Sequence, residues 1–234
     1  MKAKLLLILV TLMPLLASGQ EDNLFTRDYN EFYVGITAGW VAKDWTTTLN
    51  GRTVHEDMWG NPDKMLHGMQ FGLKLEHCLY QGLGYRTALY YEWYISKDKC
   101  LKDMGWDRFS EHCLYLPLHA MIRMTPIKNV SIVPFGGIGF NWAITGKLKS
   151  GPLSDGKGWN QLTRNQYPLE YFDYNNHTPH HWNVQAEAGV ALRVFRVELS
   201  FTYSWGLNKH QLYDIEPSRQ NKMAVNLSYV LPTE

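Results

Sequence analysis

The sequence predicts an all-β fold, an eight-stranded antiparallel up-and-down transmembrane β-barrel. Three observations support this prediction. Residues 182–207 form a hairpin pattern in which apolar and polar residues alternate. The same alternation recurs along the chain and gives eight expected strands, an even number. The connections between them alternate between short and long, as in outer-membrane barrels, where periplasmic turns are short and extracellular loops longer.

The hairpin turns at Phe195 and Arg196. If Val194 faces Val197, Arg193 lies opposite Glu198, and the polar face carries matched charges. The same register pairs Glu187 with Ser204, Ala186 with Trp205 and Ala188 with Tyr203. The other face is apolar over roughly the 9–11 residues that a tilted strand needs to cross a membrane. A soluble barrel would turn this face inward, so the orientation depends on the rest of the chain.

The N-terminus has the features of a signal peptide, which we expect at residues 1–19. Lys2 and Lys4 precede an apolar run at residues 5–16, and small residues occupy positions 17–19. The run is too short to span a membrane as a helix, and no run of about twenty apolar residues follows. Spanning must therefore be done by strands. We expect a short periplasmic leader at residues 20–31 and the barrel at residues 32–231.

The remaining strands follow from the same alternation. The eight expected strands are residues 32–41, 65–79, 83–96, 110–124, 130–145, 182–194, 197–207 and 222–231. The four expected extracellular loops are residues 42–64, 97–109, 146–181 and 208–221.

The short turns carry recognisable signals. Gly82 can supply a left-handed position after Tyr80 and Gln81, in a register that sets Glu76 opposite Arg86. A tight turn is expected at residues 125–129, which include Pro126. Pro117 and Pro134 lie inside expected strands, and because proline lacks the ladder donor we expect bulges there.

Composition limits the function classes. The formal net charge of +1 gives no reason to expect a nucleic-acid partner. The 9 Trp and 14 Tyr suit aromatic girdles at two membrane interfaces, although they would also suit a glycan-binding β domain. Cys78, Cys100 and Cys113 are an odd number at irregular spacing, which predicts neither a disulfide framework nor a metal site.

The polar face of the expected strands carries charges that would point into the lumen. These residues are Lys74, Glu76, Arg86, Glu92, Arg123, Glu187, Arg193 and Glu198. An eight-stranded barrel is about wide enough for side chains to fill it. We therefore expect a packed, mutually neutralising network that closes the lumen, and the alternative is a narrow porin-like path for ions or solutes.

The longest loop holds the candidate binding surface. Its members are Trp159, Tyr167, Tyr171, Phe172, Tyr174, His177, His180 and His181. Aromatic side chains on a long loop can grip a sugar or a protein, or pack against one another as a cap. The histidines, with Asp173 nearby, are a weak metal pattern, and we expect no metal.

An enzyme that modifies lipid A is a further alternative. It would need a histidine beside an acid and a nucleophile near the outer leaflet. His67 and His112 lie near the outer ends of their strands, but neither has a serine or carboxylate beside it on the same face. We therefore expect no catalytic residues and no cofactor.

Two motifs carry a family resemblance. The segments Leu114-Tyr115-Leu116-Pro117-Leu118 and Val133-Pro134-Phe135-Gly136-Gly137-Ile138-Gly139-Phe140 are similar to paired motifs of the PorT-like family, within the wider OmpA-OmpX-like class of small barrels. The resemblance implies an eight-stranded outer-membrane barrel. It does not imply a function, because members range from secretion-system components to proteins of no known role. Residues 115–117 depart from the family's acidic or polar pattern, so a secretion role is not carried over.

Together these features predict a non-catalytic barrel in the outer membrane of a Gram-negative bacterium. Its lumen would be filled by side chains, and its extracellular loops would make it a membrane-anchored binding or accessory platform. The expected partners are outer-membrane lipid and lipopolysaccharide, with another envelope protein or an extracellular ligand. The alternatives are a narrow porin-like channel, a lipid A-modifying enzyme and a soluble ligand-binding β-barrel.

Overall fold

The computed structural model describes residues 31–49, 52–56, 65–80, 82–96, 106–150, 169–170, 182–208 and 219–233. Within these ranges no helix has the length and apolar character needed to cross a membrane.

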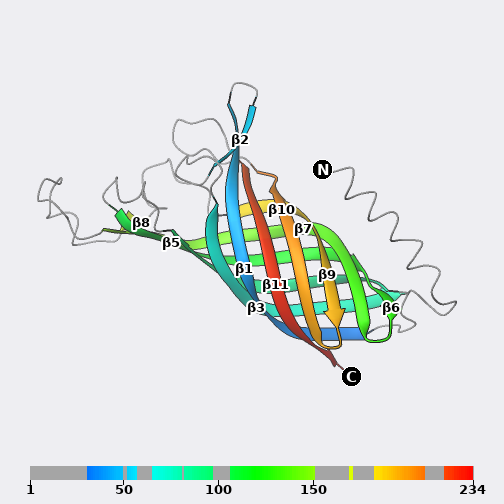
Figure 1. The fold of residues 1–234 in the computed structure, drawn as a ribbon. Helices are drawn as coiled ribbons and strands as arrows, with labels where there is room; N and C mark the ends of the chain where they lie inside the picture. The colour runs from blue at the N-terminus through cyan, green and yellow to red at the C-terminus, as the bar shows by residue number, and fades with distance from the viewer. Residues whose placement is uncertain are drawn as a thin grey trace, which may run out of the picture.

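Eight long strands of the described chain form a closed antiparallel ring (Figure 1). They are β1 (Glu31–Leu49), β3 (Leu66–Tyr80), β4 (Leu83–Ser96), β5 (Trp106–Ile122), β7 (Val130–Ser150), β9 (Trp182–Val194), β10 (Val197–Gly206) and β11 (Arg219–Thr233). Each strand pairs with the next long strand, and β11 pairs with β1. The predicted up-and-down barrel of eight strands is therefore confirmed.

Three short strands lie off the ring: β2 (Arg52–Glu56), β6 (Met124–Ile127) and β8 (Leu169–Glu170). β2 pairs with the end of β1, and β6 and β8 pair with β7.

The alternation in the sequence places apolar side chains outside and polar ones inside. On β3, Met69 and Leu73 are 61% and 60% exposed, whereas Gln70 and Lys74 are 2% and 1% exposed. Large apolar side chains on all eight strands share this outward exposure. So continuous an apolar surface, around a charged interior, is the reverse of a soluble barrel. The barrel spans a membrane.

The predicted registers are confirmed. Arg193 pairs with Glu198, and Glu187 with Ser204, across β9 and β10. Glu76 pairs with Arg86 across β3 and β4. Gly82 has a φ of 79°, the left-handed conformation expected for the β3–β4 turn. The β6–β7 turn is tighter than the predicted residues 125–129, because it contains only residues 128 and 129.

Several strands are longer than predicted, and the connections between them are correspondingly shorter than the predicted loops. β1 continues to Leu49, and β2 lies within expected loop 42–64. β5 begins inside expected loop 97–109, and β11 begins inside expected loop 208–221. β7 runs to Ser150, and β8 lies inside expected loop 146–181. Residues 41–45 of β1 are all buried, so this part of the strand lacks one lipid-facing and one lumen-facing side. Apolar and polar residues therefore do not alternate there, and the alternation in the sequence cannot show that the strand continues.

The bulges predicted at the two prolines are wrong. Pro117 pairs with Gly139, and Pro134 with Val190, without a register shift at either position. Each proline is tolerated without a bulge because the backbone N–H that it lacks would have bonded to only one of the two neighbouring strands. The carbonyl oxygen of Pro117 also accepts a hydrogen bond of 2.7 Å from Thr87 Oγ1. The β5–β7 irregularities lie elsewhere, between Trp106 and Arg108 and between His112 and Cys113.

The two ends of the barrel differ. The C-terminus lies at the same end as the turn between β9 and β10, and β2 lies at the opposite end (Figure 1). A hydrogen bond of 2.8 Å from Val230 N to Arg196 O joins the last strand to that turn. The short turns and the C-terminal strand end therefore define one rim, here called the short-turn rim, and the long connections leave from the other.

Candidate functional site: a closed polar lumen

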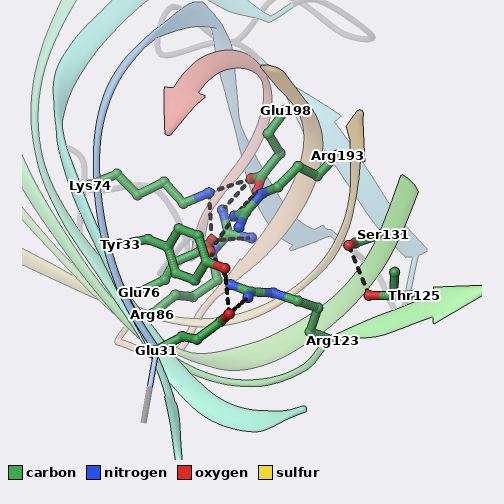
Figure 2. A network of polar contacts seen from close by, with 10 residues as sticks. All are labelled: Glu31, Tyr33, Lys74, Glu76, Arg86, Arg123, Thr125, Ser131, Arg193 and Glu198. Atoms are coloured by element: carbon green, nitrogen blue, oxygen red, sulfur yellow. Dashed lines mark hydrogen bonds and ion pairs between the residues drawn. The ribbon is translucent and has the colours of Figure 1, made fainter. Parts of the chain in front are cut away.

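The lower lumen, near the short-turn rim, contains a cluster of charges drawn from strands all around the barrel (Figure 2). Its members are Lys74 and Glu76 of β3, Arg86 of β4, Arg123 between β5 and β6, Arg193 of β9 and Glu198 of β10. All are at most 5% exposed. Their alternating positions point them inward, where burial would be unfavourable without partners.

Glu198 is one of two carboxylates that hold this cluster together. It accepts hydrogen bonds from Lys74 Nζ, from Arg86 Nη2 at 3.2 Å and from Arg193 Nη2 at 2.5 Å. These cations belong to β3, β4 and β9, so one carboxylate links strands on different sides of the lumen.

Glu76 is the second bridging carboxylate. Lys74 Nζ lies 2.6 Å from its Oε1, and Arg123 Nη2 lies 3.3 Å from its Oε2, which also accepts from Arg193. Arg123 continues the network to Glu31 at 2.9 Å and stacks on the ring of Tyr33, with 4.3 Å from Cζ to the ring centroid. β1 is thereby tied across the lumen to the β5–β6 junction.

Glu187 is the centre of the middle layer. It accepts hydrogen bonds from Tyr115 Oη and from Ser204 Oγ, the latter at 2.5 Å. His119 Nε2 lies 2.7 Å from the same carboxylate. A cavity of about 20 Å³ adjoins this layer, which is room for about one particle of the size of water.

The upper lumen is closed by a second set of charges and an apolar cluster. Glu92 accepts hydrogen bonds from Lys222 Nζ at 2.9 Å, Asn141 Nδ2 at 2.7 Å and Tyr94 Oη at 2.9 Å. Lys43 Nζ donates to Glu111 Oε2 at 2.6 Å. The apolar cluster consists of Val41, Trp45, Leu66, Tyr94, Phe109, Cys113, Ala143 and Ala224.

All eight charges expected to face the lumen are buried there. Six of them form the lower cluster, whereas Glu92 and Glu187 lie above it in separate groups. Four further charged residues of the lumen were not predicted from the sequence: Lys43, Glu111, Lys222 and Glu31. Lys43 and Glu31 were assigned to a loop and a leader, although both continue the inward parity of β1; Glu111 and Lys222 share the parity of inward residues on their strands.

All eight residues of the candidate loop surface lie outside the described residues. The two histidines weighed for catalysis are on the outer face of the barrel. His67 stacks on Trp40, and His112 stacks on Trp93 and contacts Tyr91 Oη. These contacts place both histidines within an aromatic surface.

Two rows of mostly aromatic side chains cross the outer face of the barrel. In the upper row, Trp40, Met69, Trp93 and His112 follow one another across four adjacent strands. In the lower row, Phe32, His77 and Tyr85 pair in the same way. On β4 the rows are about 26 Å apart along the strand, or about 20 Å along the axis of a barrel with strands tilted by about 40°. This spacing suits the apolar band of an outer-membrane barrel.

The comparisons with known proteins gave no family model and no curated protein that matches this chain. Among solved structures it is similar to Ail, the attachment invasion locus protein of Yersinia pestis, in complex with the heparin analogue sucrose octasulfate. Those chains are 11% identical, with 86% of this chain and 99% of Ail covered and a TM-score of 0.42.

Two further solved structures are similar. Neisserial surface protein A is 11% identical, with 85% of this chain and 96% of that chain covered and a TM-score of 0.43. The outer membrane protein OprG of Pseudomonas aeruginosa is 8% identical, with 90% and 99% covered and a TM-score of 0.41. The strand pairing and register of this chain itself define the eight-stranded barrel.

Proposed function

We propose that this protein is a non-catalytic outer-membrane barrel that acts as a membrane-anchored binding or accessory platform through its extracellular loops. The observation that carries the proposal is the filled lumen. Two carboxylates, Glu76 and Glu198, bind cations from opposite walls, and the apolar cluster around Tyr94 fills the other end. A cavity of only about 20 Å³ between them supports an anchor better than a channel.

The strands that project at the rim opposite the short turns support the platform role. β7 stays paired with β5 as far as Ser150, beyond the last β7–β9 pair at Trp142. β1 likewise continues into a hairpin with β2. These paired extensions would hold the long loops away from the lipid, including the candidate binding surface at residues 159–181.

The outer membrane of a Gram-negative bacterium is the membrane that suits this barrel. The N-terminal signal peptide would export the chain, and the aromatic rows would contact outer-membrane lipid and lipopolysaccharide. Membership of the OmpA-OmpX-like class fits the strand number, and the PorT-like resemblance stays a prediction. Another envelope protein or an extracellular ligand is the partner proposed for the loops.

Conductance across a planar lipid bilayer tests the closed lumen. The purified, folded barrel should give no single-channel steps above background, while a wide porin measured in the same bilayer serves as the positive control. Reproducible steps from this protein would favour the narrow porin-like channel.

Lipid A mass spectra test the enzyme alternative. Spectra from cells with and without the protein should be identical, and a new acylated or deacylated species would favour the lipid A-modifying enzyme.

A further inference from the structure

A row of small residues crosses the lipid-facing surface of the barrel. Ala120 of β5 pairs with Gly136 of β7, which pairs in turn with Ala188 of β9. The same register leads to Tyr85 of β4 at one end of the row and to Tyr203 of β10 at the other. Since neighbouring strands are about 4.8 Å apart, the row from one tyrosine to the other is about 19 Å long. The depression over the three small residues is here called the trench.

Large apolar side chains flank the trench on both sides. Leu118 and Ile138 are exposed on the side of the long connections, and Ile122 and Val190 are exposed on the side of the short-turn rim. An open, mainly apolar groove of about 860 Å³ lies over the end of the trench between β4 and β7.

The width of the trench limits what can occupy it. On each strand the flanking positions are four residues apart, which is about 13 Å between their Cα atoms, and their side chains narrow this gap further. A transmembrane helix with its side chains is about 10–12 Å across. The trench therefore has the width of a single acyl chain and is too narrow for a helix.

The two turns below the trench carry exposed cations. Lys128 lies in the β6–β7 turn and Arg196 in the β9–β10 turn, and neither forms an ion pair with a described residue. A hydrogen bond of 2.8 Å from Phe195 N to Asn129 O joins the two turns. Neither turn contains an aspartate or a glutamate. The short-turn ends of β7 and β9, which carry two of the three small residues, therefore form a positively charged edge.

This charged edge is continuous with the lipid-facing surface. Phe195 and Ile127, which precede the two cations in the sequence, are 70% and 65% exposed, more than any other large apolar side chain among the described residues. Val194 and Val197 pair beside the β9–β10 turn and are also exposed. Apolar side chains next to Lys and Arg at the edge of a lipid-facing surface place the cations at the level of lipid headgroups.

We propose that the trench and the two turns form a binding site for one anionic glycerophospholipid, in the leaflet at the short-turn rim. One acyl chain lies in the trench, and the phosphate group contacts Lys128 and Arg196. The site goes beyond the platform function and depends on the membrane-spanning barrel, not on its loops.

The depth of the trench fits one lipid. The six residues from Val130 to Gly136 span about 20 Å of β7, or about 15 Å of depth at a strand tilt of about 40°. One leaflet of a bilayer with a hydrocarbon core of about 30 Å is about 15 Å thick. A lipid whose phosphate lies at the turns can therefore reach the trench with its acyl chain.

Native mass spectrometry tests the proposal. The folded protein is released from detergent micelles that contain equal amounts of phosphatidylglycerol and phosphatidylcholine with identical acyl chains, so that only the headgroups differ. One phosphatidylglycerol should stay bound to each barrel, in preference to phosphatidylcholine by about tenfold or more, because two cations face its phosphate. Equal retention of the two lipids, or retention of neither, would overturn the proposal.

A substitution that fills the trench tests the acyl-chain site. Ala120→Phe should reduce the bound phosphatidylglycerol at least about fivefold, because the ring occupies the space of the chain. Leu227→Phe is the control, since Leu227 is exposed to lipid on β11, away from the trench, and this variant should keep the lipid. If Ala120→Phe fails to fold, Ala188→Phe replaces it. Undiminished retention in the folded trench variant would contradict the assignment.

Substitution of the cations tests the headgroup site. The double variant Lys128→Gln with Arg196→Gln should retain the two lipids equally. Arg219→Gln is the control, because Arg219 is exposed near the opposite rim, where β11 pairs with Thr46 of β1, and this variant should keep the preference. A double variant with an unchanged preference would contradict the role of the turns. Lipid-free dimers of the unaltered protein that Ala120→Phe abolishes would assign the trench to a second copy of the chain and overturn the proposal.

Discussion

At the scale of single residues, the lumen is a set of buried charges that are stable only as partners. Lys43 and Glu111 form the simplest case, a one-to-one pair. Their atoms Nζ and Oε2 lie 2.6 Å apart, and among the described residues Lys43 forms an ion pair with this carboxylate alone. Glu198 is the opposite case, because it serves Lys74, Arg86 and Arg193 together. The same kind of substitution should therefore have different consequences at these two positions.

Substitution of Lys43 by Met should lower the free energy of unfolding by about 3–5 kcal/mol, because Glu111 stays buried without its cation. The double variant Lys43→Met with Glu111→Leu should recover most of the loss. Urea unfolding of both single variants and the double in lipid bilayers gives the coupling energy. A double variant no more stable than Lys43→Met would refute the pairing.

The equivalent pair in the lower cluster should behave differently. Arg193→Met alone leaves Glu76 and Glu198 with their other cations, Lys74, Arg86 and Arg123. Adding Glu198→Met removes a carboxylate that Lys74 and Arg86 also need, so this double variant should be less stable than Arg193→Met. If Arg193 and Glu198 were an isolated cross-strand pair, as the sequence predicts, the double variant would instead be more stable than Arg193→Met. The free energies of unfolding of the two variants distinguish the shared network from the isolated pair.

At the scale of the strand, the sequence predicts what lies in the lipid and loses precision beyond it. β9 and β4 have the predicted bounds, because a membrane on one side and a packed lumen on the other impose strict alternation. β1 and β7 run well past their predicted ends, where no such contrast exists. The prolines did not predict the bulges, because each proline lacks only one backbone N–H and so loses a hydrogen bond to only one neighbouring strand.

A charge on the lipid face should be penalised according to its depth. Leu73 is 60% exposed in the middle of β3, and Leu79 is 52% exposed near the short-turn rim. Leu73→Arg should lower the free energy of unfolding in phospholipid bilayers by about 2–4 kcal/mol, and Leu79→Arg by no more than about 1 kcal/mol. Equal effects at the two positions would argue against a bilayer around this face.

The β3–β4 turn should depend on its glycine. Gly82 has a positive φ, and a Cβ there would lie 2.2 Å from the carbonyl oxygen of Arg123. Gly82→Ala should therefore lower the free energy of unfolding by at least about 1–2 kcal/mol. Gly136→Ala is the control, because its Cβ would meet only Glu187 O, at 3.2 Å. Similar unfolding midpoints for the two variants would show that the turn tolerates a side chain.

At the scale of the whole molecule, parity predicted which side chains enter the lumen but not which of them meet. Lys74 and Glu198 are 124 positions apart and on strands that are not neighbours, so their contact depends on the closure and shear of the barrel. The register between the two strands of a hairpin, by contrast, depends on residues close together in the sequence. The pattern of apolar and polar residues around the β9–β10 turn therefore predicted it. The loop residues proposed to bind a partner carry no comparable periodic signal.

The orientation of the barrel in the cell is a property of the whole chain. With Cys78, Cys100 and Cys113 replaced by alanine, single cysteines are placed at Phe195, which is 70% exposed in the β9–β10 turn, and at Ser154, in the longest connection. In whole cells a membrane-impermeant maleimide should label position 154 and not 195, because the short-turn rim would face the periplasm. Lysed cells, in which both positions should react, control for access. Labelling of 195 alone would reverse the orientation and place the proposed platform in the periplasm; equal labelling of both in a released soluble fraction would contradict the membrane barrel.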